Sequence, residues 1–168
     1  MPAVRSLFFL GALFGLALLL QVTLAGMISL WGAVPDLVLL PVVFHGLWRG
    51  SREGALWGFA AGLGKDFLCG HYLGLSALSL SAAGYLAGWA ESRLYKESTA
   101  VALLTTLGCS LASQLIYYPL LFFVGVKVPL VTAVVRVILP TAVYSAALVP
   151  LFYPLFSRLY QRGWMGSG

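Results

Sequence analysis

The stretch that decides the fold is 34–88, which contains VPDL at 34–37, GALWGFAAGLGKD at 54–66, LGL at 73–75 and GYLAG at 84–88. Charge, glycine and irregular backbone meet in these segments, whereas long apolar runs surround them. Function is therefore expected in this stretch first.

The composition is that of an integral membrane protein. Of 168 residues, 61% are hydrophobic and 9% are charged, whereas about a quarter are charged in a soluble domain. We expect a single transmembrane domain over 1–168, with Gly-Ser-Gly at 166–168 typical of a cloning remnant. The net charge of +5 comes from scattered basic residues, which indicate fixed membrane orientation and not nucleic-acid binding.

Six apolar segments predict an all-α fold of six transmembrane helices. They are 7–27, 37–48, 54–65, 75–90, one within 99–126, and 130–156. The second is short, because its residues rise only about 18 Å. Asp36 begins the second helix and Asp66 ends the third, so both are expected at similar depth on one side of the membrane. There they would form a polar recess.

Charged side chains in this recess should be paired, because an unpaired charge costs roughly 2.5–3.5 kcal/mol at the bilayer centre. Lys65 is the expected counter-ion. Arg136 is expected to snorkel to the nearby surface or, as the alternative, to pair with Asp36 or Asp66. Asp36 has a second interpretation of equal weight, as the carboxylate at the positive dipole end of the second helix.

Gly54, Gly58 and Gly62 recur every four residues and form a smooth stripe that lets another helix approach closely. We expect this stripe to pack inside the protein. A surface for a partner protein is the alternative.

The basic residues predict the orientation. With six spans, seven of the ten lie on one side, which the positive-inside rule places in the cytoplasm together with both termini. The recess then opens to the outside. The seven are Arg5, Arg49, Arg52, Arg93, Lys96, Arg158 and Arg162, against Lys65, Lys127 and Arg136 on the other side.

Sequence signatures of catalysis are absent. The chain has no Walker-type loop, no His and Cys at metal-ligand spacing and no serine elbow. We therefore predict neither enzymatic activity nor a cofactor.

The order of the Pro35-Asp36-Leu37 motif, the glycine-spaced helix ending in Asp66, and the Leu73-Gly74 pair resembles the MreD family of rod shape-determining proteins. The resemblance is densest over 34–96 and weaker over 144–160. It implies a bacterial inner-membrane component of the cell-elongation machinery that is not an enzyme. It also implies that the chain holds a single-span MreC-type partner and, through it, a RodA-type glycosyltransferase and a class-B penicillin-binding protein, with coupling to an MreB-like filament.

The same resemblance implies a fold similar to the six-helix substrate-binding components of vitamin importers. A small-molecule-binding membrane subunit of such an importer is therefore the alternative function, although the outer loops offer chiefly His71 and Tyr72 as ligand contacts. Whether the recess holds a membrane lipid or another ligand stays open at this point, and an intramembrane enzyme is the least favoured interpretation.

Overall fold

The computed structural model describes residues 2–24, 27, 34–69, 72–93, 98–127 and 129–161, and every regular element in this part of the chain is helical. The expected all-α class is therefore confirmed. The helices are α1 (Pro2–Leu24), α2 (Leu39–Arg49), α3 (Ser51–Cys69), α4 (Leu75–Glu91), α5 (Thr99–Phe123), α6 (Leu130–Ala133), the π-helix η1 (Val134–Ile138), α7 (Leu139–Ala147) and α8 (Val149–Gln161).

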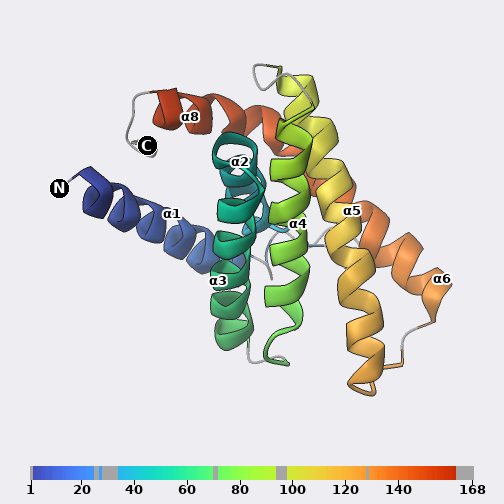
Figure 1. Cartoon of the computed structure of the whole chain (residues 1–168). Coiled ribbons are helices and arrows are strands. Elements are labelled where there is room, and N and C mark those ends of the chain that lie inside the picture. Colours follow the sequence, from blue (N-terminus) through green and yellow to red (C-terminus); the bar gives the residue numbers. More distant parts are fainter. Residues whose placement is uncertain are drawn as a thin grey trace.

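The centre of the structure is the antiparallel pair α3 and α4, with α2 packed against both (Figure 1). Gly50 joins α2 to α3, and its φ of +94° lies in the left-handed region that favours glycine. All residues of α2 from 39 to 47 are buried. A helix that is apolar on every side belongs in a core, so the shortness of α2 reflects a place inside the bundle.

The glycine stripe packs against the backbone of α4. A Cβ added to Gly58 would lie 2.8 Å from the carbonyl carbon of Leu80, and one added to Gly62 would lie 2.5 Å from the carbonyl oxygen of Ser76. Gly54 meets the backbone of α4 equally closely. The prediction of internal packing is therefore confirmed, and the stripe is not available as a surface for a partner.

Two expected helix boundaries are wrong. The third helix continues to Cys69, so Asp66 lies inside α3 and does not end it. The segment 130–156 is not one helix, because α7 ends at Ala147 and α8 then crosses the end of the bundle (Figure 1). Pro150 explains the break, since its ring nitrogen has no hydrogen to donate to the carbonyl oxygen four residues earlier.

Two described helices are long and apolar enough to cross a membrane, namely Thr99–Phe123 and the continuous helix Leu130–Ala147. The count of six spans stays a prediction. Figure 1 shows that the α2–α3 turn and the connection from α4 to α5 lie at the same end of the bundle. The prediction that Arg49, Arg52 and Arg93 lie on one side of the membrane requires this arrangement. The side chain of Arg5, and all of Lys96, Arg162 and 166–168, lie outside the described residues.

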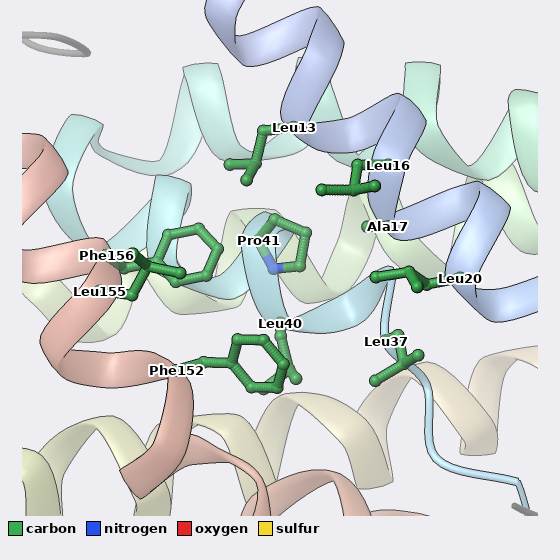
Figure 2. A pocket seen from close by; sticks show the side chains of 10 residues that line it. All are labelled: Leu13, Leu16, Ala17, Leu20, Leu37, Leu40, Pro41, Phe152, Leu155 and Phe156. Atoms are coloured by element: carbon green, nitrogen blue, oxygen red, sulfur yellow. The ribbon is translucent and has the colours of Figure 1, made fainter. Parts of the chain in front are cut away.

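An apolar cavity of about 100 Å³ separates α1 and α8 from α2 (Figure 2). Pro41 of α2 faces it, and leucine and phenylalanine side chains of α1 and α8 surround it. Because its lining offers no polar side chain, the cavity has nothing to orient a polar ligand. The full lining is Leu13, Leu16, Ala17, Leu20, Leu37, Leu40, Pro41, Phe152, Leu155 and Phe156.

Candidate functional site

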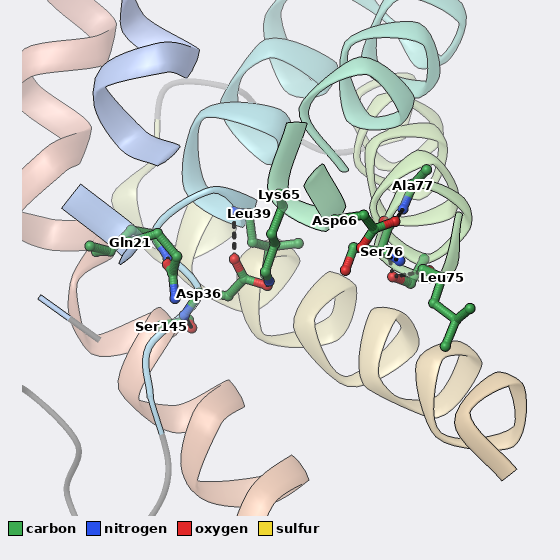
Figure 3. Close-up of polar contacts among 11 residues, drawn as sticks. Gln21, Asp36, Leu39, Lys65, Asp66, Leu75, Ser76, Ala77 and Ser145 are labelled. Atoms are coloured by element: carbon green, nitrogen blue, oxygen red, sulfur yellow. Dashed lines mark hydrogen bonds and ion pairs between the residues drawn. The ribbon is translucent and has the colours of Figure 1, made fainter. Parts of the chain in front are cut away.

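Lys65 and Asp36 form an ion pair between α3 and the segment that precedes α2 (Figure 3). The Lys65 Nζ donates to Asp36 Oδ2 at 2.7 Å, and the two side chains are 22% and 9% exposed. Lys65 lies about 21 Å along α3 from Ser51. The pair therefore lies nearer the end of α3 than its beginning, and because both side chains are largely buried an unpaired charge there would be costly.

The backbone around Asp36 is held by two further helices. The Asp36 N–H donates to Ser145 Oγ of α7 at 3.0 Å, and the Leu37 N–H donates to Gln21 Oε1 of α1 at 2.6 Å. Asp36 Oδ1 accepts from the Leu39 N–H at 3.3 Å, so the carboxylate also caps α2. Asp36 is therefore both the partner of Lys65 and a cap of α2, and a functional role for it stays a prediction. We call this meeting point of α1, α2, α3 and α7 the Asp36 junction.

Asp66 caps α4 and makes no ion pair with any residue that the structure describes. Its Oδ2 accepts from the N–H groups of Gly74 at 2.8 Å and Ala77 at 3.4 Å, and its Oδ1 accepts from that of Ser76 at 3.3 Å. The first N–H groups of a helix have no acceptor within the helix, and a carboxylate suits this end of the dipole. Asp66 is therefore fully satisfied inside α3, and it fastens α3 to α4.

Arg136 is exposed on η1 and pairs with neither acid. The alternative in which it enters the recess is therefore wrong, and its exposure agrees with snorkelling.

At the far end of α2, the buried His45 lies with Nε2 3.3 Å from Glu53 Oε2, which also accepts from Arg49 Nε at 2.9 Å. This second cluster holds the turn between α2 and α3.

A polar cavity of about 160 Å³ adjoins the ion pair, and the recess expected from the sequence is thus present. Figure 1 shows that α4 and α5 are close together where α4 ends and move apart toward the other end of the bundle, where α4 begins. Side chains of α3, α4, α5 and the segment before α2 line the cavity. They are Asp36, Lys65, Ser76, Ser79, Ser113, Gln114 and Tyr117.

Sequence reasoning missed several residues of this region. Gln21 and Gln114 each carry a polar amide within a long apolar run, and polar side chains in such runs often bond to neighbouring helices. This signal was available. Ser145 carried none, because it resembles any small residue of a membrane helix and its bond joins positions 109 residues apart.

A comparison with known families found one described as rod shape-determining protein MreD, whose model matches residues 4–163 of the 168. No curated protein and no solved structure matches the chain. The expected likeness to vitamin-importer components therefore stays a prediction.

Proposed function

The chain belongs to the MreD family of rod shape-determining proteins, and we propose that it is a non-enzymatic scaffold of the machinery for cell elongation and peptidoglycan synthesis. It holds a single-span MreC-type partner in the inner membrane. Through that partner it holds a RodA-type glycosyltransferase and a class-B penicillin-binding protein. An MreB-like filament on the cytoplasmic side is a further partner.

The Asp36 junction is the observation that supports this function best. The Asp36 carboxylate accepts from Lys65 and from one backbone N–H, and that of Asp66 accepts from three backbone N–H groups at the start of α4. Buried acids held in this way serve helix packing, whereas a general acid or base must be within reach of the proton that it transfers. The charged residues of the interior thus support a fixed platform of helices for partner proteins.

Partner helices would bind the outer faces of this platform. Large apolar side chains are exposed on α1 and on the continuous helix 130–147, including Leu16, Leu19, Val131 and Val135. In a bilayer, helices associate chiefly through van der Waals packing, so a partner helix would pack against these faces in place of lipid. A single-span partner has a transmembrane helix to offer, which matches this kind of contact.

The proposed topology has six spans in a single transmembrane domain, with both termini in the cytoplasm. The described basic residues support it, because Arg49, Arg52 and Arg93 lie where α2 ends, α3 begins and α4 ends, at one end of the bundle (Figure 1). The positive-inside rule assigns that end to the cytoplasm. The polar cavity then lies toward the outer side.

Co-purification tests the scaffold function. The tagged chain is expressed with the MreC-type protein of the same organism and extracted in mild detergent, and an unrelated multi-span protein with the same tag serves as control. We expect the MreC-type protein to be retained by this chain only. In a rod-shaped host depleted of its own family member, the chain should restore rod shape. Failure of both retention and restoration, with normal amounts of chain in the membrane, would refute the proposal.

A further inference from the structure

We propose that the polar cavity beside the Asp36–Lys65 pair binds one compact, uncharged, hydroxyl-bearing group about the size of a monosaccharide ring. This goes beyond the scaffold function, since neither partner binding nor rod shape requires it. The inference is drawn from the unpartnered polar atoms of the lining, the charge balance of the site and the cavity volume.

The cavity is lined by polar groups that the protein itself leaves unsatisfied. Ser76 and Ser113 are each 6% exposed, and neither hydroxyl bonds to any residue in the described ranges. The side chains of Gln114 and Tyr117 also line the cavity without a hydrogen bond to the described part of the chain. By contrast, Ser79 Oγ donates to two carbonyl oxygens of α4. These hydroxyl and amide groups face an open cavity, so water or a ligand can supply their hydrogen bonds.

The charged side chains beside the cavity already have partners in the protein. Lys65 and Asp36 neutralise each other at 2.7 Å, and the carboxylate of Asp66 is taken up by N–H groups of α4. Binding an anion to Lys65 or a cation to either carboxylate would therefore have to displace one of these existing contacts. Three hydroxyls and one amide both donate and accept hydrogen bonds, and this mixture matches the hydroxyl groups of an uncharged ligand.

The volume restricts the size of the ligand. The cavity of about 160 Å³ is smaller than the pockets of about 300–1,000 Å³ that take drug-sized ligands. It is several times larger than the share of about 30 Å³ that one water molecule occupies. A single sugar ring or a glycerol unit fits this range, either as a soluble molecule or as the headgroup of a lipid.

Thermal unfolding in phosphatidylcholine nanodiscs tests the proposal and separates the two sources. Glycerol and methyl β-glucoside are titrated as soluble probes, and monoglucosyldiacylglycerol is mixed into separate discs, with diacylglycerol as the matched lipid control. We expect at least one hydroxylated probe to raise Tm by about 3–6 °C at ten times its Kd. Inorganic phosphate should produce no shift.

The variant Ser113→Ala/Gln114→Leu should weaken binding of that probe about tenfold, because it removes two of the hydrogen-bonding groups. Ser110→Ala is the matched control, since Ser110 is a buried serine of the same helix that does not line the cavity. Tyr117→Phe, which removes one oxygen, replaces the double variant if the latter does not fold. Absence of any shift with the hydroxylated probes, an equal shift with phosphate, or an unchanged Kd in the variants would overturn the proposal.

Discussion

The Asp36–Lys65 pair should show strong energetic coupling in a double-mutant cycle of Asp36→Asn and Lys65→Met. Each single change leaves one charge without its partner in the interior of the bundle. Breaking a buried pair costs about 3–5 kcal/mol, and the low end applies because Lys65 retains 22% of its side-chain surface exposed. We therefore expect each single variant to lose about 3 kcal/mol of unfolding free energy.

The double variant should lose no more than either single variant, about 3 kcal/mol and not the sum of about 6 kcal/mol, because no charge is then left unpaired and the caps on the backbone survive. The coupling energy is thus about 3 kcal/mol, near the top of the range for residues in direct contact. It is measured by titrating purified protein in mixed micelles with denaturing detergent, with helical circular dichroism as the readout.

Arg136→Met is the control for this cycle, because it removes a positive charge from an exposed position that pairs with neither acid. Combined with Asp36→Asn, it should be additive within about 0.5 kcal/mol. Additive losses for Asp36 and Lys65 would refute the ion pair as the interaction that holds the Asp36 junction.

Gly58→Ala should destabilise the protein by about 1–3 kcal/mol in the same titration, because the added Cβ would overlap the backbone of α4. Gly108→Ala is the control and should not destabilise the protein, because open space surrounds the position of its Cβ. Equal effects of the two changes would mean that α3 and α4 are not in close contact. Asp66→Leu should cost about 2 kcal/mol through loss of the cap on α4, and hydrogen exchange should rise selectively at the first turn of α4; a uniform rise would contradict the capping role. With the native cysteines removed by Cys69→Ser and Cys109→Ser, a cysteine at Ser51 should react with a membrane-impermeant thiol reagent only from the cytoplasmic side and one at Tyr72 only from outside, and the reverse pattern would invert the proposed topology.

Local sequence determined the all-α fold class and the internal packing of the glycine stripe. Glycines at every fourth position lie on one side of a helix whatever surrounds them, so the close packing of Gly54, Gly58 and Gly62 followed from spacing alone. The need for a counter-ion beside Asp36 also followed from sequence, because a charge inside an apolar helical bundle is costly wherever the chain leads. Membership of the MreD family was equally visible, since its motifs lie in order along the chain.

Only the tertiary structure decided how the polar groups are shared. Lys65 could have paired with either acid, and the choice depended on where the segment before α2 meets α3, 29 residues later. The bonds from the Leu37 N–H to Gln21 and from the Asp36 N–H to Ser145, like the exposure of Arg136, depend on how distant helices cross. Sequence periodicity specifies which side of a helix carries apolar or small residues, but it does not specify contacts between segments far apart in the chain. Those long-range contacts form the Asp36 junction and the polar cavity.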